Sequence, residues 1–525
     1  MFNWGDAFGR ENYFSHLLAK IILVIYGLCL VLIFLYSVLQ LSLAVNYKKN
    51  QIKDKRKPLD FNPEKAPFVT IQLPMFNELY VAERIIEQVA QMDYPLDKFE
   101  IQVLDDSTDE TVDVIAKKVI EVREKYGVNI EHIHRTNRIG YKAGALAAAL
   151  PAAKGEFVAI FDVDFLPDTD FLQKTITEFE AENIGVVQTR WGHINKHFSI
   201  LTELQAFGLD GHFAIEQVGR NSVGHFINFN GTGGIWRKAC IEDAGGWQHD
   251  TLTEDLDLSY RAQMKGWKFI YLEDVIAPAE LPITMSALKG QQHRWMKGGA
   301  ECFRKMGKRL LTAKGIKFSD RIHGLSHLFN SSIFIFIVIM SLLSLPILHI
   351  KDSFEDLNFI IQFGSIFILS TLFLMYYYWN SYREKTADKR KTRWQFFVRF
   401  FQFLTVSMGL SLNNAVAVIE GYMGIKSSFV RTPKFNVSTI KDGKIENKYD
   451  KKDISLVTIF EGILCLLFGI TAINRLAYGD IGMVPFHAML AIGYGTVFYH
   501  SIAEVHDSSF AIVPKLNAKT SNVNA

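Results

Sequence analysis

Five short polar motifs occur in a fixed order between two apolar regions of this 525-residue chain. They are Asp105-Asp106, Asp162-Val163-Asp164, Phe229-Asn230-Gly231-Thr232, Thr253-Glu254-Asp255 and Gln291-Gln292-His293-Arg294-Trp295. Each motif alone is weak, because a lone Asp-x-Asp is usually a solvated turn. Together they provide what is needed to hold a nucleotide diphospho-sugar on a metal ion, bring a hydroxyl to its anomeric carbon and remove a proton. Their order therefore predicts an enzyme that transfers a sugar.

The Asp162-Val163-Asp164 motif is a predicted metal site. Asp162 and Asp164 would share one face of an extended strand, with Val163 on the other face. Mg²⁺ or Mn²⁺ prefers one or two carboxylates together with phosphate oxygens and water, and it neutralises a leaving diphosphate. One carboxylate is expected to ligate the cation and the other to meet the donor sugar. Asp164 and Asp162 are both metal candidates, and Asp162 is also a donor-binding candidate.

The Thr253-Glu254-Asp255 motif is the predicted source of the catalytic base. Inversion by a single displacement needs one carboxylate opposite the leaving group, so Asp255 is expected to take the proton of the acceptor hydroxyl, with Glu254 beside it. The alternative is structural. Thr253 would be the N-cap of a helix over 256–264, and acidic residues are favoured in the first turn of any helix.

Donor binding is predicted at residues that follow strands. Asp105 or Asp106 would accept hydrogen bonds from a base or ribose, and Glu78 follows the first strand. Lys142 opens an alanine-rich helix, where a cation and backbone N–H groups can bind an anion. The structural alternatives are that Asp105 or Asp106 caps the next helix, although 107–109 are better placed for that, and that Lys142 is an ordinary surface lysine.

Acceptor binding is predicted at the last motif and at a loop. Gln291 and Trp295 share a helix face and could present an amide and an indole to a sugar, while Arg294 could hold the diphosphate. A tryptophan belt at a membrane surface is the alternative. The loop residues Asn230, Gly231 and Thr232 are further acceptor-binding candidates.

The elements that must position these motifs alternate between strand and helix. The pattern predicts strands over 68–73, 99–104 and 157–161 and helices over 81–92 and 111–126. This alternation predicts a mostly parallel sheet with helices on both faces, whose ligand lies at the carboxyl ends of the strands. Three segments follow strands directly and should therefore meet at one edge: Pro74 to Glu78, Asp105-Asp106 and Asp162-Val163-Asp164.

The apolar regions predict a membrane protein. Residues 21–45 carry no charge and, at about 1.5 Å per residue, exceed a bilayer core of roughly 30 Å. Further apolar blocks cover 329–350, 357–379, 394–423, 454–473 and 481–502. Basic clusters flank 394–423 on both sides, so both flanks should be cytosolic. We predict five spans plus one interfacial or re-entrant segment at 394–423, with a sixth true span as the alternative.

Composition excludes other classes. The net charge of +2 comes without a basic stripe, which argues against a nucleic-acid partner. The four cysteines are far apart in sequence, so neither a disulfide framework nor a CxxC metal site is predicted. A channel or transporter with a regulatory nucleotide domain would need charged residues inside the spans, and apart from Glu461 these are nearly absent.

Several phrases resemble the family 2 glycosyltransferases, and within them the mannan synthase and xyloglucan-backbone glucan synthase branch of the cellulose synthase-like proteins. They are Gln72 to Glu78, Gln102 to Asp109, Gly140 to Leu146, Phe229 to Gly234, Glu242 to Trp247, Gln291 to Trp295 and Gly424 to Lys434. The resemblance implies a GT-A type α/β catalytic domain inserted between transmembrane helices, with the residues above in the roles given. It implies that the spans form a channel for the product. Control by a cyclic dinucleotide is not expected.

The predicted organisation follows from these observations. It comprises an N-terminal segment with the first span (1–46), a cytosolic GT-A domain ending in interfacial helices (47–320), a transmembrane hairpin (321–380), a cytosolic basic loop with the interfacial segment and a gating-type loop (381–453), a second hairpin (454–505) and a polar tail (506–525). In the gating-type loop, Arg431 and Lys434 could reach a diphosphate. Such a protein would be integral to a bacterial plasma membrane, or to a Golgi membrane in a eukaryote.

Two predicted functions remain open at this point. The first is a processive inverting hexosyltransferase that uses GDP-mannose or UDP-glucose to extend a β-linked polysaccharide and passes it through the bilayer. The second is a non-processive enzyme that places one sugar on a lipid such as ceramide or diacylglycerol. Both use a nucleotide sugar donor, and the acceptor is a polysaccharide or a glycolipid.

Overall fold

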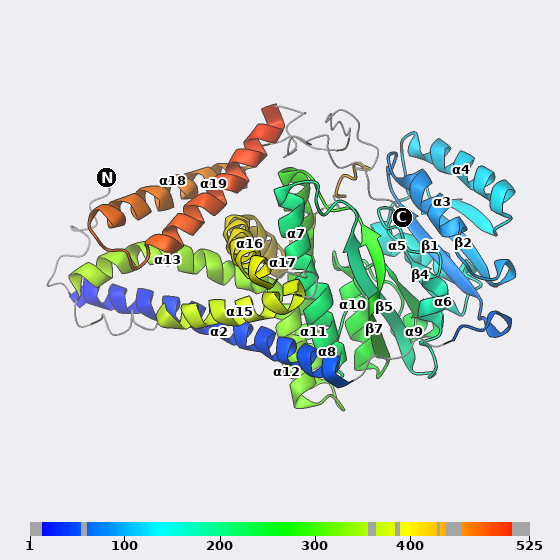
Figure 1. The fold of residues 1–525 in the computed structure, drawn as a ribbon, viewed down its shortest axis with the longest axis horizontal. Helices are drawn as coiled ribbons and strands as arrows, with labels where there is room; N and C mark the ends of the chain where they lie inside the picture. The colour runs from blue at the N-terminus through cyan, green and yellow to red at the C-terminus, as the bar shows by residue number, and fades with distance from the viewer. Residues whose placement is uncertain are drawn as a thin grey trace.

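The structure is a computed structural model that describes residues 13–53, 60–354, 357, 364–383, 389–427, 431–436, 449 and 454–506. The molecule is elongated, with a sheet-containing domain at one end and long helices at the other (Figure 1). Helix α2 (Tyr13–Lys53) runs from the helical end toward the domain, where the chain enters the sheet.

The domain is built on a seven-stranded sheet with the order β3-β2-β1-β4-β6-β5-β7. Its strands are β1 (Val69–Met75), β2 (Phe99–Asp105), β3 (Ile130–His134), β4 (Phe157–Ile160), β5 (Ile184–His193), β6 (Gly234–Arg237) and β7 (Lys268–Ala279). Only β6 is antiparallel to its neighbours β4 and β5. The sheet is therefore mostly parallel, as the alternating sequence pattern predicts.

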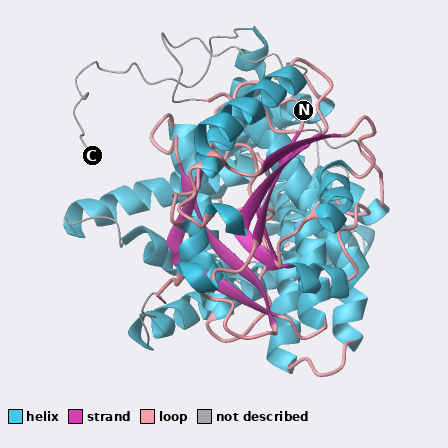
Figure 2. Ribbon diagram, turned by 90° about the vertical axis from the view of Figure 1, so that its right-hand side faces the viewer, coloured by secondary structure: helices cyan, strands magenta, loops and turns pink. Residues whose placement is uncertain are grey.

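Helices cover both faces of this sheet (Figure 2). Those of the domain are α3 (Ala82–Ala90), α4 (Thr111–Tyr126), α5 (Tyr141–Ala149), α6 (Phe171–Ile176), α7 (Ile200–Asp210), a π-helical turn (Gly211–Glu216), α8 (Gln217–Asn221), α9 (Lys238–Asp243) and α10 (Glu254–Met264). The predicted helix over 111–126 matches α4, while the helix predicted over 81–92 is shorter at both ends.

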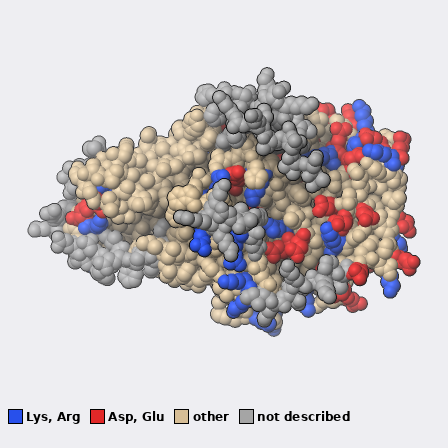
Figure 3. Space-filling model, viewed as in Figure 1, with Lys and Arg blue, Asp and Glu red and all other residues tan. Residues whose placement is uncertain are grey.

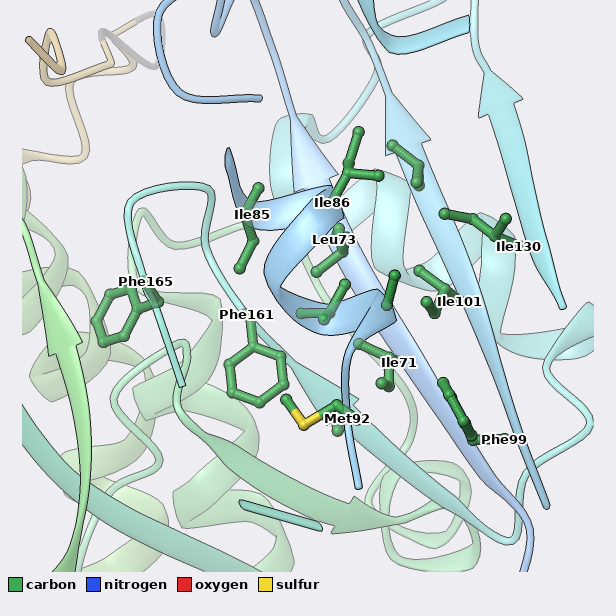
Figure 4. Close-up of a cluster of buried hydrophobic side chains, with 14 of the residues drawn as sticks. Ile71, Leu73, Ile85, Ile86, Met92, Phe99, Ile101, Ile130, Phe161 and Phe165 are labelled. Atoms are coloured by element: carbon green, nitrogen blue, oxygen red, sulfur yellow. The ribbon is translucent and has the colours of Figure 1, made fainter. Parts of the chain in front are cut away.

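The core explains why these strands are apolar on both sides. In β4, Phe157 and Ala159 join the cluster under α3, α4 and α6, whereas Val158 and Ile160 join the cluster under α5, α8 and α9. Figure 4 shows the first cluster, with Leu73 of β1 facing Ile86 of α3. Burying both faces removes water from the whole sheet and leaves the strand ends as the accessible edge.

The remaining helices form the other end of the molecule. They are α11 (Met285–Thr312), α12 (Phe318–Phe329), α13 (Ile333–Ser353), α15 (Ser365–Tyr382), α16 (Lys389–Gly409), α17 (Ser411–Met423), α18 (Leu456–Ala477) and α19 (Val484–His506). In the part of the chain that is described, three segments are long and apolar enough to cross a membrane: 16–51, 318–353 and 456–477. A bent pair formed by α16 and α17 makes a fourth if it counts as one span.

These segments include three of the five predicted spans. The predicted span over 357–379 is described mainly from Ser365 onward, and neither α15 nor α19 passes the same test of length and composition. Helices α16 and α17 meet at a bend of 50° at Leu410, a geometry that fits a broken span or a re-entrant loop. The count of five spans and the interfacial placement of 394–423 therefore stay predictions.

The surface agrees with a membrane-facing helical end. In the view of Figure 3, charged residues gather over the sheet domain, while the helical end is mostly uncharged. Large apolar side chains on α18 are widely exposed, among them Leu466 at 67% and Ile473 at 69%. Such a continuous exposed apolar surface is stable only against lipid or another apolar partner.

Candidate active site

The motifs predicted to carry the chemistry line one cavity at the carboxyl ends of β1, β2 and β4. The predicted residues that line it are Glu78, Asp106, Lys142, Asp162, Asp164, Asn230, Gly231, Glu254, Asp255, Gln291, Arg294, Trp295, Arg431 and Lys434. Parallel neighbours place these ends together: Asp105 of β2 pairs in register with Met75 of β1. The cavity holds about 200 Å³, less than the roughly 300–1,000 Å³ of ordinary ligand sites. Charged side chains of the protein itself fill much of it.

Asp162 and Asp164 each contact a lysine from a distant part of the chain. The Nζ atom of Lys142 lies 2.5 Å from Asp162 Oδ1, and that of Lys434 lies 2.6 Å from Asp164 Oδ2. Val163 is buried. The extended strand predicted for this motif is not formed, because β4 ends at Ile160 and residues 163 and 164 lie in a turn in which the N–H of Phe165 donates to the Asp162 carbonyl at 3.0 Å. Among the described residues, no group of three or more His, Cys, Asp or Glu side chains is placed to hold a metal ion. A cation here would thus depend on two carboxylates and on ligands from the substrate.

Lys142 is held at the centre of the site by the turn that precedes its helix. Gly140 and Tyr141 both have positive φ, at +75° and +50°, which brings the chain sharply into α5. Besides Asp162, the Lys142 Nζ donates to the carbonyl of Gly231 at 2.9 Å and lies 4.0 Å from Glu254. Burial lowers the pKa of Lys142, but Asp162 and Glu254 outweigh it and the pKa is raised. Lys142 therefore stays a cation among carboxylates.

Asp255 lies in the first turn of α10, beside the loop that carries Gly231. Its Oδ1 accepts from the backbone N–H of Leu256 at 2.8 Å. Burial, reinforced by the neighbouring Glu254, raises the pKa of Asp255 to about 7. Burial also raises the pKa of Glu254, against the opposing effect of Lys142. A carboxyl that titrates near neutral pH is suited to accept a proton during a reaction at that pH.

Gly231 is required by its position against Asp255. Its φ of +82° is in the left-handed region, and an added Cβ would lie 3.0 Å from Asp255 Oδ2 and 3.4 Å from Lys142 Nζ. The predicted N-cap role of Thr253 is correct in position only. Its side chain makes no capping bond, and its hydroxyl contacts Cys302 Sγ at 3.3 Å instead. Asp255 is therefore oriented by the loop and by its own helix rather than by a side-chain cap.

Two predicted site residues do not line the cavity. Asp105 is fully buried and binds His132 at 2.9 Å and the N–H of Ser107 at 2.8 Å. Those hydrogen bonds overcome the effect of burial and lower the pKa of Asp105. Thr232 is also fully buried, and its hydroxyl accepts from the N–H of Asp162 at 2.8 Å. Each residue lies behind a neighbour that reaches the cavity, Asp105 behind Asp106 and Thr232 behind Asp162, and their binding roles stay predictions.

Asp106 and Asn230 line the cavity while their polar atoms are already engaged. Both carboxylate oxygens of Asp106 accept from Arg135, at 2.7 and 2.5 Å. The Asn230 side chain accepts from Gln217 at 2.7 Å and contacts His212 Nε2 at 3.1 Å. Fixed partners leave each side chain in one orientation toward the cavity.

The motif on α11 joins this cavity to a second one. Gln291 and Trp295 line both cavities, and the second continues between helices of the other end, past Gly208, Tyr378 and Phe403. Arg294 donates to the Thr432 hydroxyl at 3.3 Å, and burial lowers its pKa although the site carboxylates oppose this. Gln291 and Trp295, the predicted acceptor-binding residues, therefore lie where the first cavity meets the helical region.

Arg431 and Lys434 reach the site from a segment far along the chain. The Arg431 guanidinium lies 2.8 Å from Glu78 and donates to the Phe76 carbonyl at 2.7 Å. Burial raises the pKa of Glu78 to about 8, against the effects of Arg431 and Lys434. Residues 428–430 of the predicted gating-type loop lie outside the described residues. The two basic residues nonetheless occupy the acidic side of the cavity.

Sequence reasoning missed several residues of the cavity, among them Arg138, Trp191, His193 and Glu280. Arg138 stacks on Phe76, with its Cζ 3.2 Å from the ring centroid. Trp191 and His193 are at the carboxyl end of β5, so the rule that polar residues after parallel strands face the ligand could have found them. Recognising β5 as a strand was the missing step.

A mostly parallel sheet with these acidic residues at its strand ends is a GT-A type glycosyltransferase domain. Residues 66–298 match the family described as "Glycosyltransferase like family 2", and this part of the chain belongs to the family 2 glycosyltransferases.

Plant proteins are among the curated relatives of the chain. The chain is 45% identical over 262 residues to probable glucomannan 4-beta-mannosyltransferase 11 of Oryza sativa subsp. japonica, covering 49% of this chain and 46% of the relative. It is 42% identical over 281 residues to glucomannan 4-beta-mannosyltransferase 1 of Cyamopsis tetragonoloba, covering 53% of each. The chain thus spans about half the length of the curated relatives it matches.

A solved structure also aligns with the chain. It is the mannosyltransferase PcManGT from Pyrobaculum calidifontis in complex with GDP-Man and Mn2+, with 19% sequence identity and a TM-score of 0.49. The alignment covers 70% of this chain and 100% of that one.

Proposed function

We propose that this protein is a processive, inverting hexosyltransferase that extends a β-linked polysaccharide from a nucleotide sugar, with GDP-mannose as the preferred donor. The observation that carries the proposal is the position of Asp255 beside Gly231, whose carbonyl accepts from Lys142, in the cavity that also holds Asp162 and Asp164. The choice of mannose over glucose is supported by the glucomannan mannosyltransferases that match half of the chain at 42–45% identity.

The proposed reaction is a single displacement. The acceptor hydroxyl oxygen forms a bond to the anomeric carbon as the bond from that carbon to the diphosphate oxygen breaks, and the hydroxyl proton passes to Asp255. Lys142 and Arg294, both cationic and both in the cavity, would compensate the charge that collects on the departing diphosphate. Attack from the face opposite the leaving group inverts the anomeric configuration.

Mg²⁺ or Mn²⁺ is the proposed cofactor, held by Asp164 and Asp162. Each carboxylate is paired with a lysine, at 2.6 and 2.5 Å, so both carboxylates already lie next to a positive charge of the kind that a metal ion would supply. When bound, the cation would neutralise the diphosphate. We expect Asp164→Ala and Asp162→Ala to weaken metal-dependent nucleotide binding by more than tenfold in calorimetric titrations with Mn²⁺. Metal-independent binding of equal strength in wild type and variants would contradict the assignment.

A polymer is favoured over a glycolipid by the second cavity. Gln291 and Trp295 are shared by both cavities, and the second is lined largely by side chains of α7, α15, α16 and α11. A chain extended at Asp255 would have a route from the catalytic cavity into the helical region. Trp295 offers an apolar plate on which a sugar ring can stack. A lipid acceptor carrying a single sugar would have no need for such a continuous path.

A gating role is proposed for the segment that carries Arg431 and Lys434. These residues pair with Glu78 and Asp164, so a donor and its cation would have to displace them to bind. Once displaced, both cations could contact the bound diphosphate and exclude water. Lys434 would therefore compete with the metal ion for Asp164, and after it is displaced it would bind the diphosphate of the donor.

The membrane setting is part of the proposal. The catalytic domain is expected on the cytosolic side, where nucleotide sugars are made, with the product leaving through the helical end. In a eukaryote the membrane would be that of the Golgi, and in a bacterium it would be the plasma membrane.

The donor and product can be tested together. Purified protein is incubated with GDP-mannose, GDP-glucose or UDP-glucose and either cation, and the product is sized before and after digestion with an endo-β-1,4-mannanase. We expect GDP-mannose to yield material longer than ten residues or so that the mannanase degrades. Turnover of UDP-glucose alone would contradict GDP-mannose as the donor. Transfer of a single sugar to an added lipid would favour the glycolipid alternative.

A further inference from the structure

The first turn of α11, the helix that carries the acceptor-side motif, is held by a carboxylate from α19. The Glu504 side chain accepts from the backbone N–H of Met285, and its Oε2 accepts from that of Ser286 at 3.0 Å. The Thr284 hydroxyl accepts from the N–H of Ala287 at 3.3 Å. The first N–H groups of a helix have no partner within it and carry partial positive charge. A negatively charged side chain more than two hundred residues away satisfies two of them here.

A second carboxylate from the same hairpin reaches α11 one turn later. Glu461 of α18 is fully buried, and its Oε2 lies 2.8 Å from the Nζ of Lys289. The same Nζ donates to the Thr458 hydroxyl at 3.0 Å, and Asn413 of α17 donates to the Lys289 carbonyl at 3.2 Å. Glu461 is the acidic residue that stands out in an otherwise apolar segment. A buried charge costs free energy unless it is paired. The ion pair with Lys289 offsets this cost, so the two residues hold each other in place.

These contacts fix the helix immediately before its functional residues. Gln291, Arg294 and Trp295 lie within about two turns of Lys289 on the same continuous helix. A shift or rotation at the first turn is transmitted to them, because a helix moves as a rigid element. Misplacement by about 1 Å at a reacting centre can cost on the order of a hundredfold in rate.

We propose that Glu504 and Glu461 are positioning residues, through which the C-terminal hairpin α18–α19 sets the place of the acceptor helix relative to the catalytic base. The inference rests on the proposed transferase function for its kinetic consequence. It adds that the hairpin, beyond bordering the membrane, is required for the acceptor side of the reaction and dispensable for donor binding, because the donor-binding carboxylates belong to the sheet domain.

The kinetic experiment compares Glu504→Gln and Glu461→Gln with wild type in detergent. Glutamine keeps the shape but turns one of the two accepting oxygens of Glu504 into an NH2 donor, and at position 461 it cannot neutralise Lys289. We expect kcat for sugar transfer to fall about tenfold while the donor KM stays within twofold, since only the acceptor side is displaced. The matched controls Thr471→Ala and Thr496→Ala remove exposed hydroxyls that bond only to their own helices, α18 and α19, and should retain wild-type kcat.

A charge exchange separates positioning from simple loss of folding. Lys289→Glu alone places two carboxylates together and should lower kcat strongly, whereas the pair Lys289→Glu with Glu461→Lys restores opposite charges across the same contact. We expect the double variant to recover at least a third of wild-type kcat. Unrestored kcat in a double variant with wild-type thermal stability would overturn the inference, as would glutamine variants with kcat within twofold of wild type or with donor KM raised in proportion.

A measurement independent of activity tests the contact itself. In hydrogen exchange on the full-length protein, Glu504→Gln should speed exchange of the peptide that begins at Met285 by about tenfold or more and leave peptides of β1 and β4 unchanged. Unchanged exchange at that peptide would sink the proposal. If wild type transferred no hexose from any donor, the proposed function would fail, while this measurement would still decide whether the hairpin holds the acceptor helix.

Discussion

Lys434 and Asp164 form an ion pair with 2.6 Å between Nζ and Oδ2, although 270 residues separate them in the sequence. The pair joins the segment after α17 to the strand end that carries the proposed metal ligand. Lys434 places a positive charge beside the carboxylate that the proposed cation would bind, and the gating proposal therefore links closure of the segment to loading of the donor site.

The gating proposal predicts a defect in how the donor is used. In Arg431→Ala and Lys434→Ala, turnover should fall by more than tenfold, and hydrolysis of the donor should rise relative to transfer because water is no longer excluded. Released nucleotide and incorporated sugar are measured in parallel. Lys426→Ala, an exposed basic residue just before the segment, serves as the control. Wild-type polymer yield in detergent from the double variant would indicate that these residues only bind lipid headgroups.

The base assignment predicts separate effects on activity, pH dependence and stability. Asp255→Asn should abolish transfer with donor affinity nearly unchanged, since the amide keeps the shape but accepts no proton. In wild type, kcat/KM should rise with pH up to about 7, where Asp255 becomes ionised. Turnover retained within about tenfold in the variant, roughly 1.4 kcal/mol of barrier, would rule the assignment out.

The raised pKa of Asp255 also has a consequence for stability, with a definite sign. A carboxyl whose folded pKa lies above its unfolded value binds more protons in the folded state, so its ionisation destabilises the fold as pH rises from about 4 toward 7. We therefore expect Asp255→Asn to melt at a higher temperature than wild type at pH 8 and at nearly the same temperature at pH 4. Calorimetry at both values checks this, and a lower melting temperature at pH 8 would argue against a buried, strained carboxylate.

Gly231 offers a test of the close approach to the base. Gly231→Ala combines positive φ with a Cβ that meets the Asp255 carboxylate at 3.0 Å, so kcat should fall at least tenfold. Gly246→Ala is the matched control, because its φ is also positive, at +68°, but nothing lies within 4 Å of an added Cβ. Both variants should lose about 1–2 kcal/mol of stability from the backbone alone. Equal activity in the two would mean that contact with Asp255 is unimportant.

The topology of the bent pair α16–α17 is open to direct test. The basic flanks predict that residues near 389 and 444 are both cytosolic, so single cysteines at these positions should resist an impermeant thiol reagent added outside intact cells. Position 444 lies outside the described residues. Labelling there alone would mean that the pair crosses the membrane once and that the predicted number of spans is one too small.

The sequence by itself determined the local elements and the chemical types of the site. The period of apolar residues marks 111–126 as a helix, and it is α4. The polar residues after β1, β2 and β4 could be assigned to one edge, because parallel strands ending in polar residues leave few other arrangements. Asp255 could be proposed as the base, because an inverting transfer needs a carboxylate on the side opposite the leaving group.

Tertiary structure alone decided which of these residues reach the cavity and what holds them. No local pattern distinguishes Asp106, which lines it, from the buried Asp105, or pairs Lys434 with Asp164 and Glu504 with the first turn of α11. Such contacts join segments hundreds of residues apart, and their geometry follows from how whole elements pack. The periodicity of a sequence shows which face of an element is buried. It does not show which other element packs on that face, and this is decided only by the folded structure.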